Sequence, residues 1–294
     1  MRRSNHPSLP SLPLFPSTPS TMSDDDIRLL ALDGGGVRGL SSLMILRNLM
    51  TTIDPDDPPK PCDYFDMIGG TSTGDLIAVL LGRVRMSVDD CITAYASTSD
   101  EVFEKKSHRV MMNGQLRGRF DSGALDRAIK QILVRTGHAE NTLIRDAANA
   151  CRVFVCATSR ETIDPVCLTS YRSLRSTHLL DCTTVWEACR ATSAATTFFD
   201  PVAIGPFGEQ FVDGALGTNN PVAALWSQAQ DVLQALICSG CIRQLTPGTD
   251  MEGHRNVEKP LPHYRGSGVE CLTYLVHCSV LGSSQSLGEG LHRT

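Results

Sequence analysis

Short apolar runs alternate with longer amphipathic segments through the middle of the chain. Strand-length runs occur at 27–32, 64–68 and 152–158, and two shorter runs flank a turn at 205–208. Apolar residues at helical spacing follow them and predict helices at 40–50, 76–81, 88–102, 124–135, 184–195 and 220–236. Strands and helices that alternate in this way predict an α/β domain with a largely parallel central sheet.

Three of the predicted helices begin with a local signal. The segments Ser87–Asp90 and Thr184–Glu187 have the spacing of a capping box, in which a hydroxyl and a carboxylate accept hydrogen bonds from backbone N–H groups at the helix start. Asn220 is a capping residue followed by Pro221 at the first helical position. These signals predict where the helices start.

The two ends of the chain lack this periodicity. Residues 1–26 are rich in proline and serine, so we expect a disordered leader, in which Met22 is an alternative start. Residues 27–236 form the predicted α/β domain, and 237–294 are expected to be a divergent, poorly ordered tail. Its best candidate strand is 271–281, but a long loop with prolines and charges precedes that segment. We therefore expect the core to end with the domain.

Composition narrows the classes of function. Hydrophobic residues make up 41% of the chain and charged residues 20%, which is typical of a soluble globular protein. The net charge of −5, without a dense Lys/Arg tract, argues against a nucleic-acid partner. Apolar runs are too short for a membrane helix or a secretory signal, and the 11 scattered cysteines suit a reducing compartment. We therefore expect a cytoplasmic protein whose contacts with membranes are peripheral.

A candidate nucleophile, Ser72, stands in the segment Gly70–Gly74 (GTSTG). This segment follows a strand-like run and precedes a helix-like one, which is the context of the G-x-S-x-G elbow of serine hydrolases. Its small residues suit a tight turn, and the serine would lie at the N-terminus of a helix. Because clusters of Gly, Ser and Thr also form ordinary turns, the segment alone leaves both interpretations open.

A second glycine-rich segment, Gly34–Gly39, lies between the first predicted strand and helix. Its G-x-G-x-x-G spacing fits a dinucleotide-binding turn, but that site also needs an acidic residue closing the next strand, and the nearest, Asp54, lies in a proline loop. No Lys-Ser/Thr pair follows, as an NTPase phosphate loop requires. The other use of such a segment is an oxyanion hole, in which backbone N–H groups stabilise a tetrahedral intermediate formed at Ser72.

A serine nucleophile needs a base, and Asp213 is a candidate. It follows a short strand and precedes Gly214 and Ala215, which are small enough to let another backbone or a substrate approach. An aspartate with an ordinary pKa of about 4 is a poor base, so the site would have to be desolvated. Taken alone, the segment also fits a turn aspartate beside a glycine.

Together, these segments resemble the patatin-like phospholipase family, and in particular its fungal members of the calcium-independent type. The resemblance covers about residues 27–230 and has its motifs in the family's order. The matching segments are Asp33–Gly39 (DGGGVRG), Asp63–Ile68, Gly70–Gly74 (GTSTG), Ala191–Phe199 and Asp213–Ala215 (DGA).

The resemblance implies a three-layer α/β/α fold and a lipid acyl hydrolase that acts on lipid aggregates or membranes without a cofactor or a metal. It implies that Ser72 attacks an ester carbonyl and that Asp213 acts as general base and then acid, in a dyad without histidine. Arg38 would contact the anionic head group or shape its loop. The oxyanion would be held by the backbone N–H groups of Gly34, Gly35 and Gly36.

Two features depart from the family pattern. Asp75 stands where the family usually has a small residue such as glycine, and a carboxylate there would add negative charge beside the forming oxyanion. The tail shows no clear further strand and instead contains cysteines and histidines, at Cys238, Cys241, His254, His263, Cys271, His277 and Cys278. Because most of these lack the paired spacing of zinc ligands, a divergent tail is favoured over a zinc site.

Two other functions stay open. An α/β-hydrolase could combine Ser72 and Asp213 with a tail histidine such as His254, because the order Ser…Asp…His fits that class. Alternatively, the chain could be a catalytically inactive regulatory protein that keeps the patatin fold, an interpretation that Asp75 and the unusual tail favour.

Overall fold

A seven-stranded mixed sheet lies at the centre of the computed structural model, which describes residues 27–102, 118–146, 148–173, 179, 181–238 and 272–276. The strand order is β5-β6-β3-β2-β1-β7, and β4 pairs with β3. The pairs among β3, β2, β1 and β7 are parallel, whereas β4, β5 and β6 pair antiparallel. The strands are β1 Arg28–Leu32, β2 Met67–Thr71, β3 Arg152–Ser159, β4 Pro165–Thr169, β5 Val202–Ile204, β6 Glu209–Asp213 and β7 Leu272–Val276.

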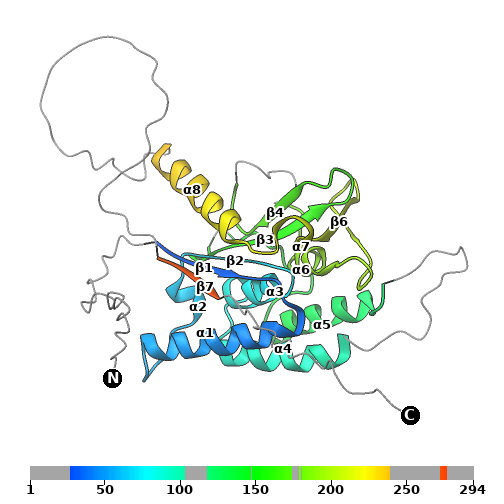
Figure 1. Cartoon of the computed structure of the whole chain (residues 1–294). Coiled ribbons are helices and arrows are strands. Elements are labelled where there is room, and N and C mark those ends of the chain that lie inside the picture. The colour runs from blue at the N-terminus through cyan, green and yellow to red at the C-terminus, as the bar shows by residue number, and fades with distance from the viewer. Residues whose placement is uncertain are drawn as a thin grey trace, which may run out of the picture.

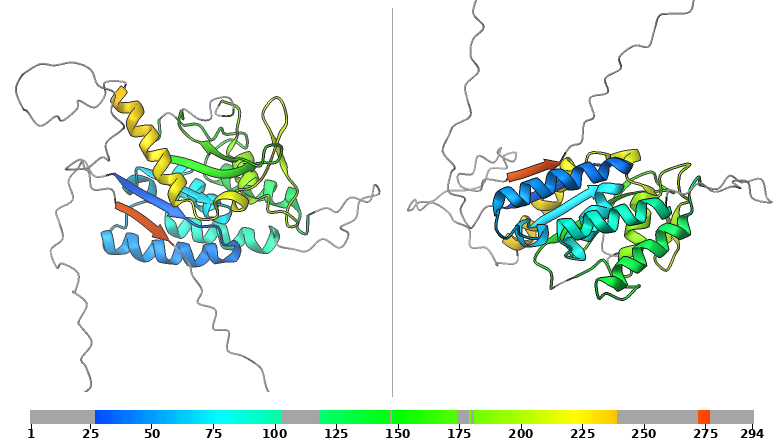
Figure 2. Two further views of the ribbon diagram at one scale, coloured as in Figure 1. Left: turned by 45° about the horizontal axis from the view of Figure 1, so that its top comes forward. Right: turned by 90° about the horizontal axis from the view of Figure 1, so that it is seen from below.

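Helices cover both faces of this sheet (Figure 1). Helix α8 crosses one face over β1 and β2, and α1, α3 and α4 lie on the opposite side, an arrangement that the turned views of Figure 2 also show. The predicted three-layer α/β/α fold is thereby confirmed. The helices are α1 Gly39–Ile53, α2 Pro61–Tyr64, α3 Thr73–Ala78, α4 Val88–Val102, α5 Ser122–Arg135, α6 Val185–Ser193, α7 Ala215–Thr218 and α8 Val222–Cys238.

Two apolar cores explain why the central strands have continuous apolar runs rather than alternating ones. In β1, Leu30 and Leu32 pack into the larger core beneath α1, α3 and α4, whereas Leu29 and Ala31 pack into the smaller core under α8. Successive side chains of a strand point to opposite faces, so a strand covered on both sides is apolar at every position.

The helix starts agree with their local signals. Thr184 and Glu187 form the predicted capping box at the start of α6, and the Ser87 hydroxyl accepts a hydrogen bond from the N–H of Asp90 in the first turn of α4. The side chain of Asn220 accepts one from the N–H of Val222 at the start of α8. The strand β4 was not predicted, because it is short and begins with a proline, which is tolerated only at sheet edges and strand starts.

The tail contributes one strand that we did not expect in the core. Residues Leu272–Val276 form β7, which pairs in parallel with β1 at the edge of the sheet. The expectation that the core ends with the domain is therefore wrong for these five residues, which fall within the candidate segment 271–281. In this position, β7 pairs with the backbone groups on the edge of β1 that faces away from β2. The sequence pattern alone could not reveal that β1 has a partner on that edge. The first two residues of the predicted tail, 237 and 238, end α8. The leader and the rest of the tail lie outside the described residues.

Strand β3 determines where β2 and β6 meet. β2 runs parallel to the first part of β3, and its last residue, Thr71, lies opposite Cys156. β6 runs antiparallel to the second part, and its last residue, Asp213, lies opposite Ala157. Because β4 occupies the other edge of β3 along this stretch, β2 and β6 share one edge and approach each other with their carboxyl ends.

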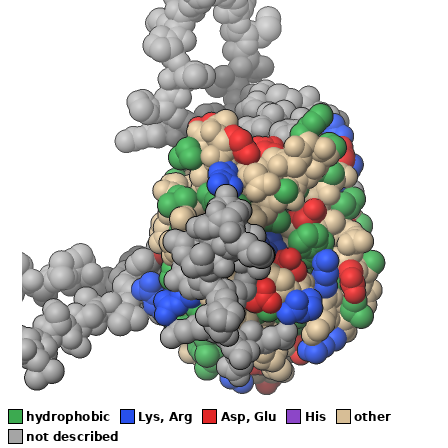
Figure 3. Space-filling view, turned by 90° about the vertical axis from the view of Figure 1, so that its right-hand side faces the viewer, with side chains coloured by type: hydrophobic (Ala, Val, Ile, Leu, Met, Phe, Trp, Pro, Cys, Tyr) green, Lys and Arg blue, Asp and Glu red, His purple; other side chains and the backbone are tan. Residues whose placement is uncertain are grey.

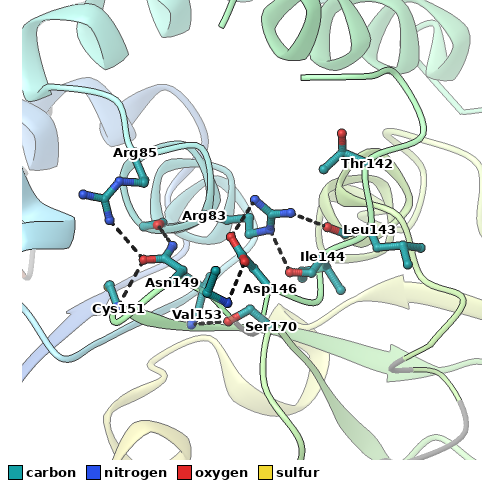
Figure 4. Close-up of polar contacts among 12 residues, drawn as sticks. Arg83, Arg85, Thr142, Leu143, Ile144, Asp146, Asn149, Cys151, Val153 and Ser170 are labelled. Carbon is teal, nitrogen blue, oxygen red and sulfur yellow. Dashed lines mark hydrogen bonds and ion pairs between the residues drawn. The ribbon is translucent and has the colours of Figure 1, made fainter. Parts of the chain in front are cut away.

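A buried arginine ties the elbow helix to a distant loop (Figure 4). Arg83 ends the π-helical segment Val79–Arg83 that continues α3. Its guanidinium donates to the carbonyls of Leu143 and Ile144, at 2.9 Å each, and its Nη1 lies 3.2 Å from a carboxylate oxygen of Asp146. The exposed fractions of the two charged side chains are only 9% and 25%.

Substituting Arg83 with methionine should destabilise the fold by about 2–4 kcal/mol, because it leaves a partly buried carboxylate and two carbonyls without their donor. Urea denaturation would measure the change. Arg85→Met is the matched control: its ion pair with Asp63 has side chains that are 45% and 49% exposed, so its loss should cost less than about 1 kcal/mol. Equal losses in the two variants would contradict the structural role assigned to Arg83.

Candidate active site

Ser72 occupies a strained turn between β2 and α3. Its backbone angles are φ 56° and ψ −124°, in a region that residues with a side chain rarely adopt. Such a conformation costs on the order of 1–3 kcal/mol and persists only where the surrounding structure holds it. Ser72 is half-buried, and it stands immediately before the first residue of α3.

Close packing of α3 against the sheet explains the glycines of the GTSTG segment. A Cβ atom on Gly70 would lie 2.5 Å from the carbonyl carbon of Gly74, and one on Gly74 would lie 2.1 Å from the carbonyl oxygen of Leu32. Both obstacles are backbone atoms, which cannot move aside as a flexible side chain can. The elbow therefore requires glycine at both positions.

The structure brings Ser72 and Asp213 together. The Ser72 hydroxyl donates a hydrogen bond of 2.8 Å to Oδ2 of Asp213, and the N–H of Ala215 donates one of 2.8 Å to Oδ1. Asp213 is 2% exposed. Burial raises the pKa of its carboxyl group, and the hydrogen bonds from Ala215 and Ser72 oppose that shift. The desolvated surroundings expected for a useful aspartate base are present.

The sequence did not reveal the role of one residue that lies behind the elbow, Thr192. Thr192, near the end of α6, accepts a hydrogen bond of 2.7 Å from the backbone N–H of Ser72. Its hydroxyl in turn donates to Asp75, also at 2.7 Å. The sequence placed Thr192 in a predicted helix and in a segment that resembles the family, but no local pattern links it to a residue 120 positions away.

The setting of Asp75 differs from the one expected. Its carboxyl group is fully buried between α3, β3 and α6, and the N–H of Cys156 donates to it at 2.7 Å. Burial holds its pKa well above the usual range, against the hydrogen bonds from Thr192 and Cys156. This shift favours the neutral acid, so the expected negative charge beside the serine is disfavoured.

The glycine-rich segment lies against the elbow. The N–H of Gly34 donates to the carbonyl of Asn219 at 3.3 Å, and the N–H of Gly35 donates to the hydroxyl of Thr73 at 3.2 Å. Gly36 begins the 3₁₀ turn Gly36–Arg38 with φ +58°, so its N–H has no acceptor within that turn. An oxyanion held by all three N–H groups would have to replace the two existing bonds.

Arg38 is exposed and lies at the end of the same turn. Its Nε donates to the carbonyl of Gly35 at 3.3 Å. This contact folds the side chain back on the glycine-rich segment, and both roles that the resemblance implied for Arg38 stay predictions.

Within the described part of the chain, no group of three or more His, Cys, Asp or Glu side chains is arranged to hold a metal ion. The tail residues weighed as zinc ligands lie outside that part, apart from Cys238, which ends α8. In the same part of the chain, no helix combines the length and the apolar character needed to cross a membrane.

Comparison with known proteins indicates the same family as the sequence motifs. The family model described as "Patatin-like phospholipase" matches residues 30–226. Human calcium-independent phospholipase A2-gamma is 30% identical over 207 residues, which are 67% of this chain and 25% of that protein. Patatin-like protein 1 of Arabidopsis thaliana is 28% identical over 214 residues, 66% of this chain and 50% of that protein.

A third relative, the Arabidopsis "Probable inactive patatin-like protein 9", is 26% identical over 211 residues, 67% of this chain and 53% of that protein. The chain thus spans a quarter to about half of the length of these relatives. The family model covers the whole of the elbow, the glycine-rich segment and Asp213. The chain belongs to the patatin-like phospholipase family.

Proposed function

We propose that this protein is a serine lipid acyl hydrolase that cleaves ester bonds of phospholipids or other acyl glycerolipids through Ser72 and Asp213. The observation that carries the proposal is the 2.8 Å hydrogen bond from the Ser72 hydroxyl to the Asp213 carboxyl, made at a strained elbow. A nucleophile within hydrogen-bond reach of a desolvated base is the arrangement that nucleophilic catalysis by serine needs.

In the acylation step, Oγ of Ser72 attacks the ester carbonyl carbon while its proton passes to Oδ2 of Asp213. The carbonyl π electrons move to the oxygen, and the resulting oxyanion is stabilised by N–H groups of the glycine-rich segment. Collapse of the tetrahedral intermediate breaks the bond to the alcohol, which leaves with the proton that Asp213 had taken. Acyl-Ser72 remains, and Asp213 is again unprotonated.

In the deacylation step, Asp213 takes a proton from water, and the hydroxide attacks the acyl-Ser72 carbonyl. The second tetrahedral intermediate expels Oγ, which regains the proton from Asp213, and the fatty acid leaves.

Gly36 would donate to the oxyanion first, because its N–H has no acceptor within its turn. Gly34 and Gly35 would join by exchanging their bonds of 3.3 Å and 3.2 Å.

Apolar side chains beside the site support a lipid substrate. Val37, within the glycine-rich segment, is 71% exposed, and Leu216, three positions after Asp213, is 65% exposed. Leu40 and Met44 continue the exposed apolar surface along α1. Large apolar residues open to water next to a site suit contact with a lipid. On the face in Figure 3, acidic and basic side chains are interspersed with apolar ones.

The names of the relatives support the same substrate class, because one of them is a phospholipase A2. We accordingly propose that the protein works at the surface of membranes or other lipid aggregates without spanning them.

The direct Ser72–Asp213 contact favours a dyad over an α/β-hydrolase triad. In a triad, an imidazole stands between serine and aspartate, and a separation of 2.8 Å leaves no space for one. His254, the tail histidine that could complete a triad, lies outside the described residues. The other alternative is a catalytically inactive protein with the patatin fold. One of the relatives has "inactive" in its name, which is a reason to test this alternative. The experiments below separate the three.

An alkyl fluorophosphonate probe should label the wild-type protein at Ser72 and should fail to label Ser72→Ala, because only an activated serine attacks such a probe. Peptide mapping by mass spectrometry would locate the label. Ser97→Ala is the matched control, since Ser97 is exposed on α4 and its hydroxyl donates to the nearby carbonyl of Ala94. Labelling of Ser72→Ala at the wild-type level would contradict the assignment, and no labelling of wild type would favour an inactive protein.

Substituting Asp213 with asparagine should lower the rate of hydrolysis of a fluorogenic acyl ester by about 10²–10⁴-fold, because an amide cannot accept the proton of Ser72. Replacing His254, His263 and His277 together with alanine should leave most of the activity. Circular dichroism would verify that both variants are folded. Loss of activity in the folded triple variant would support the histidine triad instead of the dyad.

The pH dependence of kcat/KM should report the raised pKa of Asp213. Below that pKa the carboxyl group is protonated and cannot take the proton from Ser72, so kcat/KM should fall as the pH falls. The acidic limb should lie above the value of about 4 that is usual for aspartate. The limb should persist in Asp75→Asn; its disappearance there would assign it to Asp75.

A further inference from the structure

Asp75 is bonded to both sides of the Ser72 backbone. Its own N–H donates to the carbonyl of Ser72 at 3.0 Å, one turn back along α3. Its carboxyl group accepts from the hydroxyl of Thr192 at 2.7 Å, and that hydroxyl accepts from the N–H of Ser72 at 2.7 Å. The peptide groups before and after the nucleophile are thus both held through one residue.

The direction of these hydrogen bonds indicates how the carboxyl group of Asp75 acts on the backbone of Ser72. A threonine hydroxyl has one hydrogen to donate and lone pairs with which to accept. Because that hydrogen is given to Oδ2 of Asp75, a lone pair of the Thr192 oxygen is left facing the Ser72 N–H. Bonds linked in such a chain polarise and strengthen one another in a buried setting, and Thr192 and Asp75 are both fully buried.

A residue with a strained backbone keeps its conformation only where hydrogen bonds or packing hold it. At φ 56° and ψ −124°, Ser72 would relax to an ordinary turn if its peptide groups were released. Such a relaxation would turn Cβ and Oγ away from Asp213, although neither reacting group had been changed. A displacement of about 1 Å in a reacting atom can cost about 10²-fold in rate.

We propose that Asp75 is a positioning residue, which acts through the Thr192 hydroxyl to hold the backbone of Ser72 in the conformation that aims Oγ at Asp213. The proposal rests on the proposed function, because it takes Ser72 to be the nucleophile. Asp75 touches neither the substrate nor the reacting atoms. The residue that departs from the family pattern thereby supports the elbow instead of weakening it.

The amide of asparagine is the appropriate replacement for Asp75. It keeps an acceptor oxygen for the Thr192 hydroxyl and for the N–H of Cys156, and it matches the size of the acid. Alanine removes that acceptor and leaves the Thr192 hydroxyl free to rotate. At Thr192, serine keeps the hydroxyl, whereas valine removes it at similar volume and leaves the N–H of Ser72 without its acceptor.

The test is the kinetics of fluorophosphonate labelling at Ser72 in the full chain, measured well below each variant's Tm. Asp75→Ala and Thr192→Val should lower the labelling rate at saturating probe by about 10- to 100-fold, with little change in the half-saturating probe concentration. Asp75→Asn and Thr192→Ser should keep most of the rate. The double variant Asp75→Ala/Thr192→Val should be no slower than Thr192→Val, because Asp75 acts through Thr192.

Thr183→Val is the matched control for the loss of a buried threonine hydroxyl. Thr183 is 1% exposed and donates to the carbonyl of Leu179, away from the elbow. Its loss should lower Tm without changing the labelling rate, which is the result that a merely structural role of Asp75 would also give.

The outcomes separate this proposal from the proposed function. Wild type that is never labelled at Ser72 would overturn both. Wild type that is labelled, with an unchanged rate in Asp75→Ala or with additive losses in the double variant, would overturn only the role of Asp75. If Asp75→Ala does not fold, the Thr192 variants decide: a wild-type rate in Thr192→Val would overturn the proposal.

Discussion

The pairing of β2 and β6 with one edge of β3 is the interaction on which the candidate site depends. Ser72 and Asp213 are 141 positions apart in the sequence, and neither segment contains a signal for the other. They meet because β2 ends opposite Cys156 and β6 ends opposite Ala157, on consecutive residues of the same strand. A shift of one residue in either register would turn the side chains to the other face of the sheet. Sheet register therefore determines whether a dyad exists.

Two buried carboxyl groups, those of Asp213 and Asp75, lie on different sides of Ser72. Their different positions are the reason that we propose different roles for them. Burial raises the pKa of both Asp213 and Asp75. Asp213 stands at the end of β6 and accepts a hydrogen bond from the hydroxyl of Ser72. Asp75 lies on the inner side of the elbow, where its carboxyl group accepts hydrogen bonds from the N–H of Cys156 and the hydroxyl of Thr192. Environment rather than residue type would therefore separate the proposed base from the proposed positioning residue.

Family membership by itself does not decide activity, because function resides in the site rather than in the fold. The relatives include a human phospholipase and a plant protein named as probably inactive, at similar identities and similar coverage of this chain. Each of these relatives is about two to four times as long as the shared region. In this chain, the local geometry that bears on activity is the strained backbone of Ser72 and its hydrogen bond to Asp213.

The sequence by itself predicted the local elements and supplied the candidate reacting groups, Ser72 and Asp213. Apolar spacing predicted most helices and the central strands, capping residues located helix starts, and Gly70 and Gly74 marked an elbow, because each of these depends on contacts between residues near in the chain. The tertiary structure alone decided that β7 joins the sheet, that the N–H groups of Gly34 and Gly35 are already engaged, and that Asp75 is buried against Thr192. These features depend on strand pairing and on desolvation, which arise only when distant segments pack together and which leave no periodic pattern along the chain.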